Sequence, residues 1–238
     1  MRGTKQSREV FTTKRLFVLI IALDCAPSVA KTKGGIMLNI AGIVRNSFVD
    51  WPAKIAFVVF LGGCNFACPH CHNYDILSST ANKLPFVDVL EEIKYQIGFI
   101  DGVVLSGGEP AMYPQIREII TQIRALGLPI KLDTNGSNFL LLKELVMGKL
   151  VDYVAMDIKA PFDQYVPLGF IKGNKNKTDL ILENVKSSIE FLKEGHVPYM
   201  FRTTPIPELT EKDFEGIKSI VGKAPWIKNN FVEVGGTN

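Results

Sequence analysis

The stretch that decides the fold runs from Ile55 to Asn73 and reads IAFVVFLGGCNFACPHCHN. Its first seven residues are continuously apolar, which predicts a short strand buried on both faces. Two glycines follow, and then Cys64, Cys68 and Cys71 stand within a span of eight residues. Cysteines gathered this tightly indicate a metal site before they indicate disulfides.

Apolar runs and helical periodicities alternate along the rest of the chain. Further strands are predicted at residues 103–105, 130–133, 153–158, 199–203 and 231–234. Helices are predicted at residues 86–97, 116–123, 139–146 and 180–192, and beyond Thr210, which resembles a capping partner of Asp213. This order predicts an α/β fold with a parallel sheet and outer helices. The periodicity leaves open whether the sheet is doubly wound or an incomplete barrel.

Polar or metal-binding groups follow five of the predicted strands. In parallel βα folds the carboxyl ends of the strands share one edge, and ligands bind there. The groups are, in chain order, the three clustered cysteines, Ser106–Pro110, Asp133–Gly136, Asp157–Lys159 and Arg202–Thr204. We therefore expect one site, built from all five groups, at this edge of the sheet.

The cysteine spacing is C-x3-C-x2-C, and it suits an iron–sulfur cluster. Three thiolates can hold three irons of a [4Fe–4S] cluster, which leaves the fourth iron open to a ligand. The alternative is a zinc-stabilised binding module that uses the cysteines with His70 or His72. Zinc sites usually pair two separated halves, and the remaining histidine and cysteine of the chain, His196 and Cys25, supply no second half.

Several further motifs accompany the cysteines, and together they resemble one known family. They are Ser47–Pro52, Phe60–Cys64, Cys71–Asn73, Lys131–Gly136, Ala155–Pro161 and Phe201–Thr204. The chain resembles the radical S-adenosylmethionine (SAM) enzymes over about residues 38–234. Within them it is most similar to the glycyl-radical-enzyme activating proteins, in particular the group that activates anaerobic ribonucleoside-triphosphate reductase.

The resemblance implies a partial (β/α)6 radical SAM barrel and an oxidoreductase of the activating type. In that family SAM binds the open iron of a [4Fe–4S] cluster, and one electron splits it into methionine and a 5′-deoxyadenosyl radical. The radical removes hydrogen from a backbone glycine of a glycyl radical enzyme, such as anaerobic ribonucleotide reductase. An electron donor such as flavodoxin or ferredoxin is implied as well. The alternative is a radical SAM enzyme for a small molecule, such as a nucleoside or deazapurine precursor.

The resemblance also assigns site residues, with Cys64, Cys68 and Cys71 as the cluster ligands. The residues expected at the cofactor are His70, Cys71, His72, Gly108, Glu109, Asp133, Asp157, Ile158, Lys159 and Arg202. In pyruvate formate-lyase activators the positions of the two aspartates also help to hold a monovalent cation. The resemblance further places Asp50–Pro52 near the mouth of the site, with a plain turn before the first predicted strand as an equal alternative. It offers no match, among Gly235–Asn238, for a SAM-contacting histidine of those activators.

The composition limits the classes of partner. Lysine and arginine number 27 and aspartate and glutamate 24, and a net charge of +3 gives no reason to expect a nucleic-acid partner. The chain is 238 residues long, and 47% of them are apolar, which permits a packed core.

The first 36 residues differ in character from the rest. Leu16–Leu23 is apolar but far shorter than the roughly 20 residues that span a bilayer, so no membrane partner is expected. We expect residues 1–36 to be a dispensable extension or sequence upstream of the true start at Met37, with a signal peptide as the alternative. Residues 37–238 would then be the radical SAM domain, and its oxygen-sensitive cluster implies a reducing cytoplasm.

Overall fold

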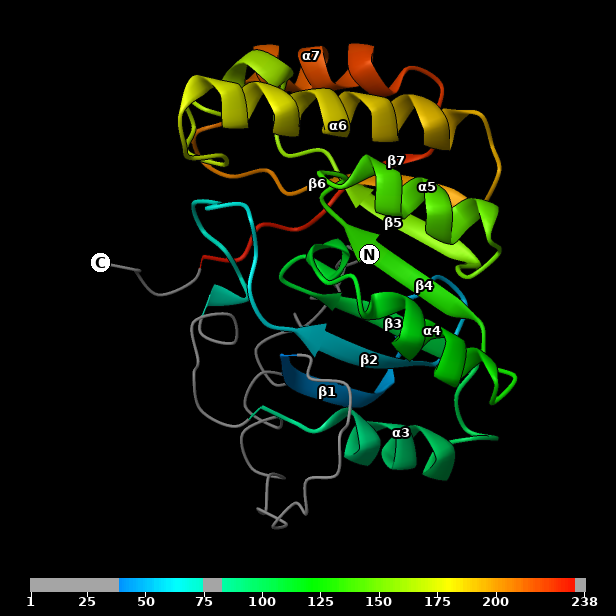
Figure 1. Cartoon of the computed structure of the whole chain (residues 1–238). Coiled ribbons are helices and arrows are strands. Elements are labelled where there is room, and N and C mark those ends of the chain that lie inside the picture. The colour runs from blue at the N-terminus through cyan, green and yellow to red at the C-terminus, as the bar shows by residue number, and fades with distance from the viewer. Residues whose placement is uncertain (1–38, 75–82, 234–238) are drawn as a thin grey trace, which may run out of the picture. The chain divides into compact units, whose positions relative to one another are not determined.

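A curved sheet of seven strands carries the fold in the computed structural model, which describes residues 39–74 and 83–233 (Figure 1). The strands are β1 (Ile40–Ser47), β2 (Ala56–Leu61), β3 (Gly102–Gly107), β4 (Ile130–Thr134), β5 (Tyr153–Asp157), β6 (Tyr199–Thr203) and β7 (Trp226–Lys228). Each strand lies beside its sequence neighbour, and every pair is parallel except β1 and β2. Cys25, the remainder of residues 1–36 and Gly235–Asn238 lie outside the described residues.

Helices connect the parallel strands and lie along one side of the sheet (Figure 1). They are α3 (Phe86–Tyr95), α4 (Ile116–Arg124), α5 (Phe139–Met147), α6 (Lys175–Lys193) and α7 (Glu211–Val221), with short 3-10 turns η1 (Pro110–Met112) and η2 (Phe162–Gln164). Thr210 and Asp213 cap α7 reciprocally, as their spacing predicts. None of the described helices is long and apolar enough to cross a membrane.

The two faces of β2 explain why its sequence is apolar throughout. Phe57, Val59 and Leu61 point into the large core under the helices. Ala56 and Val58 point the other way, into a smaller cluster with Trp51 on the inner face. A buried strand of this kind needs apolar side chains on both faces, so the alternation of a half-exposed strand is absent.

The strand order decides between the two architectures that the periodicity allows. A doubly wound sheet reverses its strand order at a switch point and carries helices on both faces. Here the order from β1 to β7 follows the chain without reversal, and the helices share one side (Figure 1). The fold is therefore the partial barrel that the resemblance implies, with parallel strands and outer helices.

Three details of the predicted elements are wrong. The strand expected at 231–234 is absent from residues 231–233. The last strand is β7, because its residues 226–228 already occupy the edge of β6, where they pair with residues 201–203. Helix α6 begins at Lys175 rather than at residue 180, since the Asn174 side chain accepts a hydrogen bond from Lys177 N. Strand β1 was not predicted at all.

The end of β3 offers a stability test at Gly107. Its backbone has φ +110°, and an added Cβ would lie 2.4 Å from Leu61 O. Gly127 is the matched control, because it has φ +81° but open space around an added Cβ. Gly127→Ala should lower the free energy of unfolding by about 1–2 kcal/mol, and Gly107→Ala by about 1–3 kcal/mol more. Urea unfolding followed by circular dichroism measures both, and equal losses would contradict the close approach of β2 and β3.

Candidate functional site

The carboxyl ends of the parallel strands bring the predicted groups to one edge of the sheet. Leu61 pairs with Gly107 at the ends of β2 and β3, and Asp157 pairs with Arg202 at the ends of β5 and β6. The cysteine loop continues from the end of β2, where Figure 1 shows it as a cyan segment beyond the arrowhead. All five polar groups predicted from the sequence therefore start from this edge, which we call the rim.

The cysteine loop is anchored to its neighbours by hydrogen bonds. Asn65 Nδ2 donates to Ser137 Oγ at 2.7 Å, and Asn135 Nδ2 donates to Asn65 Oδ1 at 2.9 Å. On the far side of the loop, Asn73 Nδ2 donates to Gly107 O at 2.8 Å. The end of β3 and the segment that follows β4 thus fix the position of the loop before any cofactor binds.

The three cysteines of the loop are free and half-buried. Burial raises the pKa of the Cys64 thiol to about 12, against a hydrogen bond that Phe66 N donates to its sulfur at 3.4 Å. Burial also raises the pKa of Cys68, and the Lys159 ammonium opposes that rise. The Cys64 and Cys68 thiols are therefore protonated in the metal-free protein, and a metal that binds them must displace protons.

This donor set fits a [4Fe–4S] cluster. Three thiols on one short loop match three irons, each of which takes one thiolate. Among residues 39–74 and 83–233, no group of three histidine, cysteine, aspartate or glutamate side chains is arranged so that it could hold a single metal ion.

An alternating row of charges crosses β4, β5 and β6 at the rim, and we call it the charge ladder. It consists of Lys131, Asp133, Arg202, Asp157 and Lys159. Arg202 joins the two carboxylates, with Nη1 at 3.1 Å from Asp133 Oδ2 and Nε at 2.9 Å from Asp157 Oδ1. Lys159 Nζ lies 2.9 Å from Asp157 Oδ2, and Lys131 Nζ contacts Asp133 Oδ1.

The charge ladder keeps both aspartates, Lys159 and Arg202 ionised despite their burial. Burial alone would raise the pKa of Asp157, but the cations of Arg202 and Lys159 lower it to about 2. The same competition lowers the pKa of Asp133, where Arg202 and Lys131 supply the positive charge. Burial disfavours the charged forms of Lys159 and Arg202, yet the carboxylates raise the pKa of both groups. Lys159 and Arg202 therefore both form salt bridges with the aspartates of the rim.

Glu109 lies behind the rim with a fully buried side chain. Its oxygens accept hydrogen bonds from Ala111 N at 3.0 Å, Thr134 Oγ1 at 2.7 Å and Asn135 N at 2.6 Å. Burial raises the pKa of its carboxyl to about 7, although these three donors favour the ionised form. In this structure Glu109 therefore holds the loops after β3 and β4 together, and its contact with a cofactor stays a prediction.

Backbone hydrogen bonds fix the positions of Gly108 and Ile158, two further residues that are expected at the cofactor. Gly108 N donates to Leu61 O at 2.8 Å, which ties the loop after β3 to the end of β2. Ile158 is buried, and its N donates to Arg202 O at 2.8 Å. Both residues lie at the rim, where backbone atoms can face a ligand.

His70 and His72 meet a segment near the end of the described chain. The rings of His70 and His72 lie 5.5 Å and 6.4 Å from that of Phe231. His70 Nε2 is 2.8 Å from Glu208 Oε1, and His72 Nε2 is 2.8 Å from Val232 O. Residues 231–233, where a strand was expected, instead cover one side of the cysteine loop.

Sequence reasoning missed Lys131 and Phe231 as site residues. Lys131 stands two residues before Asp133 in β4, and this spacing places both side chains on one face of a strand. That signal was available in the sequence. Phe231 carried no such signal, because its contact with the histidines depends on how the chain leaves β7.

The expected position of Asp50–Pro52 near the mouth of the site is wrong. These residues precede β2, whereas the cysteines follow it, so they lie at opposite edges of the sheet. Trp51 is buried on the inner face, with its ring 6.2 Å from that of Tyr153. An added Cβ on Gly102 would lie 2.8 Å from the Trp51 ring, so this glycine makes room for it.

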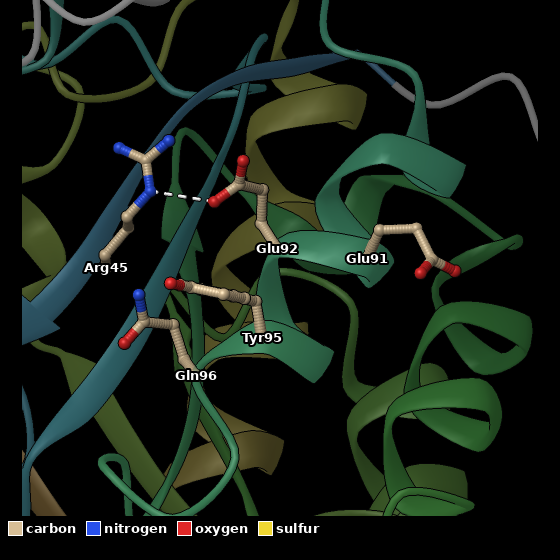
Figure 2. A pocket seen from close by; sticks show the side chains of 5 residues that line it. All are labelled: Arg45, Glu91, Glu92, Tyr95 and Gln96. Atoms are coloured by element: carbon tan, nitrogen blue, oxygen red, sulfur yellow. Dashed lines mark hydrogen bonds and ion pairs between the residues drawn. The ribbon is translucent and has the colours of Figure 1, made fainter.

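A separate pocket of about 490 Å³ lies between β1 and α3 (Figure 2). Its lining is Arg45, Glu91, Glu92, Tyr95 and Gln96. Arg45 Nε is 2.8 Å from Glu92 Oε2, and this hydrogen bond lowers the pKa of Glu92. None of the rim residues described above lines this pocket.

Asp157 allows the charge ladder to be tested through pH. Its folded pKa of about 2 lies below the usual value, so its ionised form adds stability above about pH 4, and this stability is lost as pH falls toward 2. The loss should reach about 2 kcal/mol. Asp157→Asn should therefore be less stable near neutral pH but lose less stability on acidification, as measured by urea unfolding of the iron-free protein.

Asp179→Asn is the control for this test, because Asp179 pairs with Lys175 on the exposed surface. This variant should retain the pH dependence of the wild type. A wild-type pH dependence in Asp157→Asn would mean that Asp157 does not form the charge ladder in solution.

Comparison with known proteins gives the same family as the motifs. Residues 58–219 match the radical SAM superfamily. The chain is 35% identical over 184 residues to a Methanocaldococcus jannaschii protein named as a candidate glycyl-radical enzyme activating enzyme, covering 76% of this chain and 75% of that one. It is 30% identical over 199 residues to the pyruvate formate-lyase-activating enzyme of Streptococcus mutans, covering 76% and 71%.

A solved structure supports the fold. Streptococcus suis SuiB bound to S-adenosylmethionine superposes with a TM-score of 0.55 at 14% identity, over 73% of this chain. The chain spans 39% of the length of SuiB, so this likeness shows the shared barrel alone. The family match covers more than half of the chain, and the fold agrees with it. The chain belongs to the radical SAM superfamily, whose enzymes use a [4Fe–4S] cluster and SAM.

Proposed function

We propose that this protein is an activating enzyme that installs a glycyl radical on a partner protein. The observation that carries the proposal is the 35% identity, over three quarters of both chains, to a protein named for this activity. The similarity to a pyruvate formate-lyase-activating enzyme points to the same class. The three free thiols beside the charge ladder supply the donors and charges that such chemistry needs.

The residues of the rim have distinct roles in this proposal. Cys64, Cys68 and Cys71 hold the cluster, which supplies the electron that splits SAM when it is bound. Lys159 and Arg202 face the carboxylate of SAM, and Asp133 and Asp157 hold these two cations in position at its binding site. The charge ladder places these groups before SAM arrives, so little reorganisation is needed on binding.

Other predicted contacts complete the proposed SAM site. Gly108 and Ile158 offer backbone atoms, and His70 and His72 lie beside the cysteines. Glu109 supports the loops that carry these residues, through the hydrogen bonds to Thr134 and Asn135.

The proposed partner is a glycyl radical enzyme, with anaerobic ribonucleotide reductase as the first candidate. A flavodoxin or ferredoxin would supply the electron, and an oxygen-sensitive cluster suits a reducing cytoplasm. Neither a nucleic acid nor a membrane takes part in this proposal. A radical SAM enzyme for a nucleoside or deazapurine precursor is the competing outcome of the tests below.

The cluster ligands can be tested by iron content. Protein reconstituted without oxygen should bind about four irons, whereas Cys64→Ala, Cys68→Ala and Cys71→Ala should each lose the cluster and its visible absorption. Cys25→Ala is the matched control, since the same substitution in the N-terminal extension should leave the iron content unchanged. Full iron content in the Cys71→Ala variant would refute the ligand assignment.

The radical chemistry can be tested in two steps. Reduction with dithionite in the presence of SAM should release methionine and 5′-deoxyadenosine, and the Cys71→Ala variant should release neither. On mixing with the partner, electron paramagnetic resonance should then detect the doublet of a glycyl radical, because hydrogen leaves the glycine Cα.

A partner variant with alanine in place of that glycine is the control, and it should give no doublet. If 5′-deoxyadenosine forms but no glycyl radical enzyme acquires a radical, the small-molecule alternative is favoured. If 5′-deoxyadenosine does not form in iron-loaded, reduced protein, both readings fail.

A further inference from the structure

Lys131 is the most deeply buried charge of the ladder. Its side chain is 1% exposed, and it lies on β4 at the level of Val104 in β3 and Tyr153 in β5. Its ammonium group contacts Asp133 Oδ1. An enclosed lysine side chain needs a fixed anion beside it, because burying an unpaired charge is costly. Asp133, with 9% of its side chain exposed, is that anion.

Every carboxylate oxygen of Asp133 and Asp157 already faces a protein cation. Asp133 Oδ1 contacts Lys131, and Asp133 Oδ2 accepts from Arg202 at 3.1 Å and from Ser106 Oγ at 3.0 Å. Asp157 Oδ1 accepts from Arg202 at 2.9 Å, and Asp157 Oδ2 accepts from Lys159 at 2.9 Å. Two negative charges thus meet three positive charges.

These contacts do not fit the inorganic monovalent cation that the resemblance implies. An added cation would be a fourth positive charge among two carboxylates, in a site where burial strengthens repulsion. It would also have to displace a tethered ammonium from Asp133 Oδ1. The third carboxylate nearby, Glu109, bonds with neutral donors instead of with the charge ladder.

We propose that the Lys131 ammonium is the built-in counter-cation of this site and takes the place of an inorganic monovalent cation. Lys131 is then a positioning residue: it holds Asp133, and through Asp133 the guanidinium of Arg202. The proposal extends the SAM site proposed above, and it rests on that site only where SAM cleavage is measured.

The test compares cations of different size in otherwise equal buffers. The reconstituted protein would be studied in KCl, NaCl and choline chloride at equal ionic strength, without SAM for thermal unfolding and with SAM and dithionite for 5′-deoxyadenosine. The variants are Lys131→Met, which keeps the length of the side chain without its charge, and Lys175→Met. Lys175 is the matched control, because it also pairs with an aspartate, Asp179, but is 84% exposed.

The wild type and Lys175→Met should unfold at the same temperature in all three salts. Lys131→Met should unfold about 10 °C lower in choline chloride. It should recover about 4 °C of that loss in KCl or NaCl, since a small cation can then bind beside Asp133. SAM cleavage by the wild type should be equal in the three salts.

Two results would overturn the proposal. One is a wild-type protein whose unfolding temperature or SAM cleavage rises in KCl or NaCl relative to choline chloride. The other is a Lys131→Met variant that unfolds like the wild type. If Lys131→Met does not fold, the wild-type measurements still decide. The unfolding readout needs no SAM, so a failure of the proposed function would not be mistaken for a failure of this proposal.

Discussion

The guanidinium group of Arg202 is the constraint on which the rim depends. It lies at the end of β6 and reaches the carboxylates of both β4 and β5, at 3.1 Å and 2.9 Å. Removing one partner from a buried pair leaves an uncompensated charge, which typically costs about 3–5 kcal/mol. Arg202 therefore fixes the relative positions of three strand ends, and the loops that continue from those ends inherit their positions.

The cysteine loop shows how fixed strand ends can position a connection that has no regular secondary structure. Phe66 anchors the loop by packing into the main core, and hydrogen bonds to the surroundings fix its polar side chains. Asn65, Asn73 and Asn135 supply these hydrogen bonds, which join the loop to the end of β3 and to the segment that follows β4. A site held this way needs little reorganisation when ligands bind, as catalysis by preorganised charges requires.

Much of this arrangement could be predicted from the sequence, because it follows from local pattern and strand direction. The apolar run before Cys64 gives β2, and parallel strands bring the residues that follow them to one edge. What could not be predicted depends on contacts between distant segments. Strand β1 alternates poorly, and its pairing with β2 is antiparallel. The position of Phe231 depends on its contacts with His70 and His72.

Trp51 shows how a resemblance can mislead where direct geometry does not. A motif shared with a family does not say which end of a strand it occupies, whereas chain order does, since Trp51 precedes β2 and the cysteines follow it. Lys131 is the opposite case, because the resemblance did not assign it to the site although the sequence pattern pointed to it. Its two-residue spacing from Asp133 places both side chains on one face of β4.

The tethered ammonium of Lys131 has a general physical advantage over a dissolved cation. A free ion occupies a site in proportion to its concentration and affinity, whereas a side chain on the same strand is always close to its partner. Its cost is the burial of a charge, which is compensated only while Asp133 stays ionised. Arg202 keeps Asp133 ionised, as the lowered pKa of that carboxyl indicates. The stability of Lys131 in its position thus depends on Arg202, and the five charges of the ladder act as one unit.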